Sequence, residues 1–279
     1  MTSKAPSKWS DLLVRTASAA VLIPVVIAAI WLGGVWYLVF IGLLSCLIAH
    51  EWAVIVHPGN QLQYALHLTT AASGTLLTSY YGAQVSVSAI LTIALISGML
   101  VRFGDSPGSK WSYFGIFYVG FPAIAFVLLR QDTNYGFAAI LWIFLIVWSA
   151  DILAYFAGRV IGGPKLAPRI SPKKTWAGLA GAILGSAIAS LVISHFLNLS
   201  GSFMLALLAG VLAIAEQGGD LFESSLKRFH GVKDSGRLIP GHGGVIDRVD
   251  GLIAVAIIAA LIGMSRGESL GAAQGLLLW

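Results

Sequence analysis

Long apolar runs alternate with short polar or glycine-containing breaks along the whole chain. A helix that spans a bilayer needs about 20 mostly apolar residues, and nine runs approach that length. The third run is the most polar, because it contains Gln63, His67 and several Thr and Ser residues. The pattern therefore predicts an all-α, polytopic transmembrane helical bundle with about nine spanning helices, near residues 15–33, 35–56, 62–81, 85–102, 111–130, 135–157, 176–198, 202–222 and 249–265.

The composition supports a lipid environment for most of this chain. Of the 279 residues, 57% are hydrophobic and 10% are charged, and the mean hydropathy is +0.85. A soluble domain carries roughly a quarter charged residues, so this chain has too little polar surface to cover a water-soluble globule. In lipid, only helices or a closed barrel satisfy the backbone, and a barrel would show short alternating segments. We predict one integral membrane domain over residues 1–279, with its catalytic region at about 145–255.

Basic residues are distributed unevenly between the two sides of the predicted topology. One side carries only Arg130 and Arg266. The positive-inside rule places the other side in the cytoplasm, which predicts a bacterial inner membrane protein with a cytoplasmic N-terminus. The net charge of +5 is then a topology signal and a contact with anionic membrane lipids, and no nucleic acid partner is predicted. This cytoplasmic side carries the remaining 15 Lys and Arg residues, at the N-terminus and in or beside the loops near 57–61, 103–110, 158–175 and 223–248.

Charged residues are concentrated between residues 216 and 250, where 11 of the 29 in the chain (17 basic and 12 acidic) lie. Crowded acids beside a membrane are costly unless a cation or a specific partner compensates them. Glu216 and Asp220 are four residues apart and share a helix face. Lys227 joins that face if the helix continues for two more turns. We predict a functional role for Asp220, while for Glu216 a role in the site and a simple helix end in the headgroup region stay open.

A glycine-rich stretch follows, with His242, Gly243 and Gly244 just before two acids. Glycines at a helix start let backbone N–H groups turn toward an anion. Asp247 and Asp250 are three residues apart, and such carboxylates suit Mg²⁺, which takes a few carboxylates together with waters and substrate phosphates. The alternative is a glycine turn followed by acids that favour a helix N-terminus. Basic residues in the same window favour phosphate chemistry, which needs both cations and a metal.

A second basic segment precedes the seventh predicted span. Lys173 and Lys174 are candidates to hold phosphates, and Thr175 is placed to cap the helix. The alternative is an ordinary cytoplasmic loop, which is rich in lysine in any membrane protein. Asp151 lies inside the sixth predicted span, where placing an acid costs free energy. We therefore expect it to face the bundle interior and to take part in the site.

Other polar residues give weaker signals. His50 and Glu51 end the second predicted span, and a polar helix end is favoured there over a ligand pair. Cys46 is the single cysteine, which excludes an internal disulfide. No Ser-His-Asp or Cys-His arrangement is legible, so a covalent nucleophile is not predicted.

These residues carry a resemblance to a known family. The stretch 224–250 resembles the signature of the phosphatidate cytidylyltransferases, or CDP-diglyceride synthetases. A second stretch, from Asp151 to Tyr155 with Gly158 and residues 171–175, is also similar to the family, and the resemblance extends from about residue 145 to the end. The signature positions are Ser224, Leu226, Lys227, Arg228, Lys233, Asp234, His242, Gly243, Gly244, Asp247, Arg248 and Asp250.

The resemblance implies a reaction in which CTP and phosphatidic acid give CDP-diacylglycerol and pyrophosphate. It implies Mg²⁺ as the cofactor, alone or with a second cation, and it is compatible with a homodimer. By resemblance, Asp220, Asp247 and Asp250 are the metal ligands. Catalytic roles fall to Asp220, Lys227, Arg228 and Asp247, and substrate-binding roles to Asp151, Ser171, Lys173, Lys174, Thr175, Ser224, Lys233, His242, Gly243, Gly244 and Arg248. 

One position departs from the family pattern. Members often carry an acid shortly after the Ser-Pro-Lys-Lys-Thr run, and this chain has Ala177 there. We expect one or two of the clustered charges, such as Asp234 or Arg237, only to pair with other charges. Two alternatives are a related lipid enzyme with a prenol-type phosphate or lipid kinase chemistry, and an ion-coupled transporter. A transporter would show paired halves, and none is visible.

Overall fold

The computed structural model describes residues 8–103, 111–241, 243–267 and 271–279. Almost all of the described chain is helical, which confirms the all-α class. The first half contains α1 (Lys8–Leu32), α2 (Gly34–Val56), α3 (Gln61–Ala72), the π-helix η1 (Ser73–Leu77), α4 (Thr78–Tyr81), α5 (Ala83–Phe103) and α6 (Trp111–Gln131). The second half contains α7 (Gly136–Val160), strands β1 (Lys165–Ala167) and β2 (Ser171–Thr175), α8 (Trp176–Phe196), α9 (Ser202–Phe229), α10 (Ile246–Gly267) and α11 (Ala272–Leu277).

Seven helices in the described residues are long and apolar enough to cross a membrane. They are α2, α5, α6, α7, α8, α9 and α10, so the predicted count of about nine is not confirmed. The apolar part of α1, Thr16–Leu32, is shorter than the others. The third predicted span is divided into α3, η1 and α4, and it buries polar side chains such as Gln63, His67 and Thr70.

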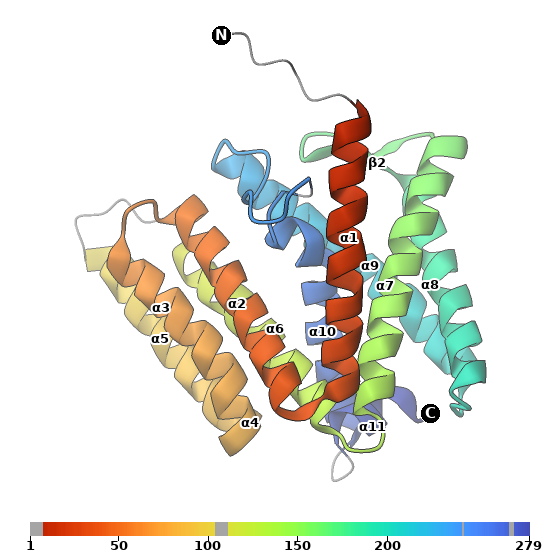
Figure 1. Cartoon of the computed structure of the whole chain (residues 1–279), viewed down its shortest axis with the longest axis horizontal. Helices are drawn as coiled ribbons and strands as arrows, with labels where there is room; N and C mark the ends of the chain where they lie inside the picture. The colour runs from red at the N-terminus through yellow and green to blue at the C-terminus, as the bar shows by residue number, and fades with distance from the viewer. Residues whose placement is uncertain (1–7, 104–110, 242, 268–270) are drawn as a thin grey trace.

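The helices pack as two groups that share one core (Figure 1). In the second half, α7 packs on α8, α8 on α9 and α9 on α10, while α2, α3 and α5 gather around α6 in the first half. Contacts of α10 with α6 and α7 join the groups. The core at this junction contains large buried side chains from α6 and α7, including Leu129, Trp142 and Ile146. Burial of such side chains contributes about 1.5–3 kcal/mol each in water, but between lipid-embedded helices close packing supplies the attraction.

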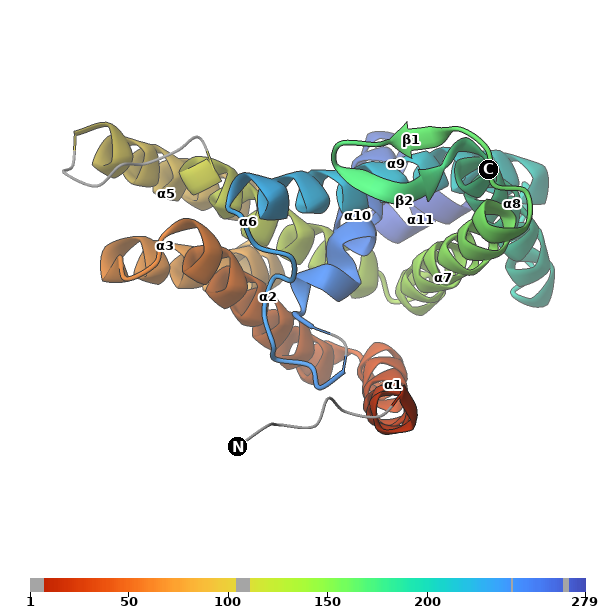
Figure 2. The ribbon, with the colours of Figure 1, turned by 90° about the horizontal axis from the view of Figure 1, so that it is seen from above.

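Two segments without long helices lie at the end of the bundle where α1 begins (Figure 2). One is an antiparallel hairpin of β1 and β2, in which Lys165 pairs with Thr175 and Ala167 with Ser171. The sequence did not predict this hairpin. The other is the 231–245 segment, described except at residue 242, which lies between α9 and α10 and reaches α1, where the Ser18 hydroxyl donates to the Pro240 carbonyl at 2.8 Å. Both helices beside it exceed their predicted bounds, since α9 continues to Phe229 and α10 begins at Ile246.

Candidate active site

One face of α9 carries a row of charged side chains. Glu216, Asp220, Glu223 and Lys227 follow one another at intervals of four, three and four residues, which places them on the same side of an α-helix. The residues before Glu216 are mostly apolar and pack in the bundle, so the row begins where the helix leaves the apolar core. The helix continues to Phe229, which meets the condition under which Asp220 and Lys227 share one face.

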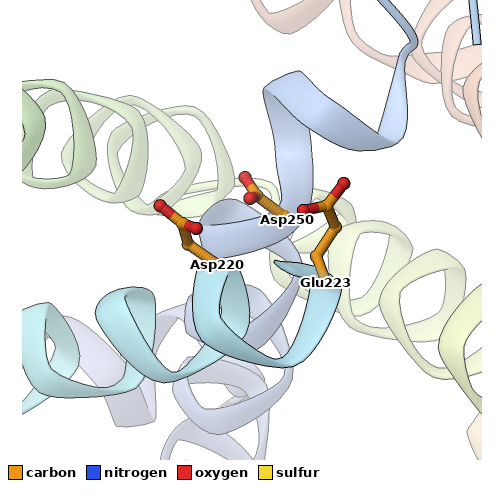
Figure 3. Close-up of side chains that lie close together, drawn as sticks. All are labelled: Asp220, Glu223 and Asp250. Carbon is orange, nitrogen blue, oxygen red and sulfur yellow. The ribbon is translucent and has the colours of Figure 1, made fainter. Parts of the chain in front are cut away.

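Three carboxylates from α9 and α10 point toward a common space (Figure 3). Asp220, Glu223 and Asp250 each offer an oxygen within 4.8 Å of the others. Asp220 and Asp250 are metal ligands predicted from the sequence and Glu223 is not, although Glu223 completes the row on α9. The signal that identifies it is the three-residue interval from Asp220. Carboxylate oxygens at these separations repel each other unless a cation or a proton compensates them.

The hairpin brings a lysine to the carboxylate group formed by Asp220, Glu223 and Asp250. Nζ of Lys174 lies 2.7 Å from Oδ2 of Asp220 and 3.5 Å from the carbonyl oxygen of Gln217. Lys174 is the fourth residue of β2, and Thr175 then ends the strand and caps α8, because its hydroxyl accepts the Gly178 N–H at 3.0 Å. The predicted cap is thus present, and it fixes the point where the hairpin meets the bundle.

A second lysine joins the two helices on the other side of the group. Nζ of Lys227 lies 2.7 Å from Oε1 of Glu223 and 2.6 Å from Oδ1 of Asp247. Glu223 is 1% exposed and Asp247 7% exposed, so these charges are largely withdrawn from water. A buried charge is tolerated when it is paired and hydrogen-bonded. Lys227 therefore links α9 to the start of α10.

Asp247 has a different position from the other predicted ligands. Its second oxygen, Oδ2, accepts the backbone N–H of Ser235 and of Gly244 at 2.9 Å each, and it lies 3.0 Å from the Ser235 hydroxyl. Both oxygens of Asp247 thus have donors from the protein. It stands beside the carboxylate group and ties the 231–245 segment to α10.

Glu51 of α2 also contacts this segment, although the sequence favoured a polar helix end for it. The side chain is 2% exposed and accepts hydrogen bonds from Ser235, Val245 and Ile246. An acid at the end of an apolar run was its only signal, and the partners lie more than 180 residues away. His50, its neighbour, contacts Tyr64 instead.

The remaining predicted residues surround this cluster or lie outside the described chain. Ser224 donates to Oδ1 of Asp220 at 3.3 Å. Asp151 approaches Glu216 and has Lys174, Asp220 and Arg248 as charged neighbours. It is exposed, however, and not enclosed as we expected, because it lies about 100° around α7 from buried Ala150. Exposed side chains are also found at Lys173, Arg228, Lys233 and Arg248.

Three further predicted residues and the position where the family often has an acid remain to be placed. Ser171 begins β2 and is partly buried. Gly243 has a φ of +85° and bridges to Ile239, a backbone conformation that favours glycine. His242 lies outside the described residues. Ala177 is the second residue of α8 and offers no carboxylate.

The helical bundle and its polar end define an integral membrane protein with a charged site at one face. Comparison with known proteins gives the class more narrowly. A model of the cytidylyltransferase family matches residues 13–265. The phosphatidate cytidylyltransferase of Brucella abortus biovar 1 is 40% identical over 262 residues, which cover 93% of this chain and 96% of the relative.

More distant bacteria have similar proteins. The phosphatidate cytidylyltransferase of Pseudomonas aeruginosa is 34% identical over 261 residues, with 89% of this chain and 96% of the relative covered. That of Staphylococcus epidermidis (strain ATCC 35984) is 33% identical over 251 residues, with 87% and 95% covered. The chain therefore belongs to the cytidylyltransferase family and is a nucleotidyltransferase. The resemblance that the sequence motifs carried is confirmed.

Proposed function

We propose that this protein transfers the cytidylyl group of CTP to phosphatidic acid, giving CDP-diacylglycerol and pyrophosphate. An oxygen of the lipid phosphate forms a bond to the α-phosphorus of CTP. The bond from that phosphorus to the bridging oxygen of the β-phosphate breaks, and pyrophosphate leaves with the electron pair. The named activity of the similar bacterial proteins supports this reaction. The observation that carries it in this chain is the carboxylate group flanked by Lys174 and Lys227.

The carboxylate group fits a divalent cation, and we propose Mg²⁺. Asp220, Glu223 and Asp250 supply hard oxygen donors close enough to share one ion, and Mg²⁺ takes such ligands together with waters and substrate phosphates. Two lysines contact these carboxylates, Lys174 at Asp220 and Lys227 at Glu223. A bound cation would offset the negative charge of the triphosphate. Asp247 remains a predicted ligand of the cation. In this structure its oxygens contact Lys227 and the 231–245 segment.

The basic residues have complementary roles in the proposed reaction. Little covalent chemistry is asked of the protein, since positioning and charge stabilisation dominate phosphoryl-type transfer. We assign the leaving pyrophosphate and the lipid phosphate to basic groups around the carboxylates, because lysine and arginine form charge-assisted bonds with phosphate. These are Lys173 and Lys174 of the hairpin, Arg228 of α9, Lys233 of the 231–245 segment and Arg248 of α10.

The site faces the cytoplasm in this proposal. The bundle end that carries the hairpin and the 231–245 segment is the end rich in Lys and Arg, and such loops remain cytoplasmic. CTP is available on that side. Phosphatidic acid would reach the site from the adjoining leaflet of a bacterial inner membrane.

The reaction is tested with purified protein in detergent, labelled CTP, phosphatidic acid and Mg²⁺. We expect CDP-diacylglycerol from the wild type and a loss of about 100-fold or more with Asp250→Asn, because one donor of a charge-stabilising site is removed. Asp132→Asn is the matched control, since Asp132 lies in the turn that precedes α7, at the opposite end of the bundle (Figure 1), and the oxygen of its amide can still accept the Tyr135 N–H.

Each result distinguishes among the three hypotheses. Product with a prenyl phosphate but none with phosphatidic acid would favour the related lipid enzyme. No turnover of CTP with either lipid, from protein that is folded and monodisperse, would contradict the enzyme and reopen transport. Equal losses in Asp250→Asn and Asp132→Asn would show that the carboxylate group has no special role.

A further inference from the structure

Glu51 is a buried carboxylate on a helix that carries no other part of the proposed site. It lies in the last turns of α2, where it is 2% exposed. The next residue, Trp52, is fully buried and donates its indole N–H to the Trp111 carbonyl at 3.2 Å. Trp52 also stacks with Phe222 of α9 at a ring separation of 6.4 Å. This packing holds the end of α2 rigidly against α6 and α9.

Both oxygens of Glu51 accept bonds from residues at the start of α10. Oε1 accepts the Val245 N–H at 2.8 Å, and Oε2 accepts the Ile246 N–H at 2.9 Å. The first N–H groups of a helix have no partner within it, and a negative charge is favoured beside them. Glu51 therefore caps α10 from another helix, across about 195 residues of sequence.

The 231–245 segment is shaped to admit this carboxylate. A Cβ atom added at Gly236 would lie 2.5 Å from Oε1 of Glu51, and one added at Gly244 would lie 2.6 Å from Oε2. Neither glycine could carry a side chain without moving the carboxylate or the backbone. The close approach of two glycines shows that the segment and Glu51 fit one another specifically.

Ser235 connects Glu51 to the charged cluster. Its hydroxyl oxygen lies 2.8 Å from Oε2 of Glu51 and 3.0 Å from Oδ2 of Asp247, and it accepts the Asp247 N–H at 3.3 Å. Asp247 in turn contacts Lys227, which contacts Glu223. A continuous set of polar contacts thus runs from α2 to the carboxylate group.

We propose that Glu51 is a positioning residue, which holds the 231–245 segment and the start of α10 so that Asp247 and Lys227 are fixed beside the carboxylate group. It does not contact that group itself. The kinetic part of this proposal rests on the proposed function. The structural part does not, because the contacts of Glu51 exist whatever the reaction is.

The test compares Glu51→Gln with the wild type by hydrogen exchange and by kinetics. An amide in place of the carboxylate turns an N–H group toward the backbone N–H of Val245 or Ile246, so one bond is lost. We expect exchange over residues 235–247 to rise at least about tenfold, while exchange in the hairpin and α8 stays unchanged. We expect kcat to fall by about 10- to 100-fold, with KM for phosphatidic acid within about twofold of the wild type.

Gln63→Leu is the matched control for loss of a buried polar residue. Gln63 is also 2% exposed, and it bonds with Ser97 between α3 and α5. This variant should lower the melting temperature without changing kcat of the folded protein. If Glu51→Gln behaves like Gln63→Leu in kcat and leaves exchange in 235–247 at the wild-type rate, the positioning role is wrong.

Ser235→Ala keeps the proposal testable if Glu51→Gln does not fold. It removes the hydroxyl contacts that join Glu51 to Asp247, and it leaves the Ser235 N–H bond to Asp247 and the two backbone bonds of Glu51. It should lower kcat and speed exchange around Asp247, and unchanged values would overturn the proposal. A wild type that turns over no CTP would refute the proposed function alone, and local exchange in 235–247 would still decide the role of Glu51.

Discussion

The two segments that complete the charged end of the bundle are held in different ways. The 231–245 segment is fixed by buried carboxylates, since Glu51 and Asp247 accept backbone N–H groups of Ser235, Gly244 and Val245. The β1–β2 hairpin is held by its own strand pairing, by the Thr175 cap and by Lys174. Buried carboxylates thus anchor one segment, whereas strand pairing, a helix cap and one ion pair hold the other, and both lie at the same end of the bundle (Figure 2).

Because of this difference, some charged side chains keep their partners while others can exchange them. A buried, fully bonded carboxylate keeps one geometry, because loss of any partner leaves a costly unpaired charge. An exposed ion pair contributes about 0–1 kcal/mol and exchanges partners readily. In the pair with Lys174 the Asp220 carboxylate is 33% exposed, compared with 1% for Glu223 and 7% for Asp247, while the two lysines are similarly exposed at 15% and 14%. We therefore expect Lys174 to leave Asp220 when a cation and a phosphate are bound, while Lys227 stays between Glu223 and Asp247.

The largest effect on stability is expected from Gly244→Ala, which disturbs the contacts that hold the 231–245 segment. The new Cβ would collide with the Ser235 hydroxyl and lie 2.6 Å from Oε2 of Glu51. Overpacking at such a site costs about 3 kcal/mol, which corresponds to a melting temperature lower by about 10 °C. Thermal unfolding in detergent measures this. Gly98→Ala is the control, since nothing lies within 4 Å of a Cβ there, and an equal shift in both variants would contradict the anchored arrangement.

Removing the charge of Lys174 should affect turnover more than stability. In Lys174→Met, the stem of the side chain is kept and the ammonium group is lost. We expect turnover to fall about 30-fold, equivalent to about 2 kcal/mol of barrier, while the melting temperature changes by no more than about 3 °C. Lys165→Met, at the exposed start of β1, should leave turnover within about twofold in the same assay. A large loss of stability in Lys174→Met would show that this lysine is structural.

The cap at the end of the hairpin should have an intermediate effect on stability. Thr175 is 4% exposed, and its hydroxyl accepts the Gly178 N–H. Thr175→Ala should cost about 1 kcal/mol, and Thr175→Ser should restore most of it, because serine supplies the same oxygen. Chemical or thermal unfolding of the three proteins compares them. If serine is no better than alanine, the methyl group and not the cap stabilises this turn.

The sequence predicted those parts of the molecule that depend on local spacing. Long apolar runs located the helices, and the interval between Asp220 and Lys227 placed both on one face of α9. The span count was less predictable, because α3, η1 and α4 combine a membrane-length segment with buried polar residues. Local composition does not show whether such a segment meets lipid or protein.

The parts that were missed depend on contacts between distant residues. Glu51 has its partners on α10 and in the 231–245 segment, and no spacing rule connects these to α2. The β1–β2 hairpin was missed because Ser171 and Lys173 are polar and because Pro172 disfavours a strand. The cytidylyltransferase motif nevertheless located this region, because its residues are close in sequence as well as in space.

The smallest expected effect is on the pH dependence of stability, through a histidine close to Glu51 in the sequence. His57 follows α2, six residues after Glu51, and burial, with His67 and His230 nearby, lowers the pKa of its imidazole from 6.5 to about 4. The unfolded chain then binds more protons than the folded one between these values, so stability falls as the pH decreases from about 6.5 to about 4. His57→Gln should reduce this decrease, by about 2 °C in melting temperature between pH 7 and pH 5. An unchanged pH profile in the variant would place the pH dependence elsewhere, and Thr175→Ala, which removes no titratable group, should keep the wild-type profile as a control.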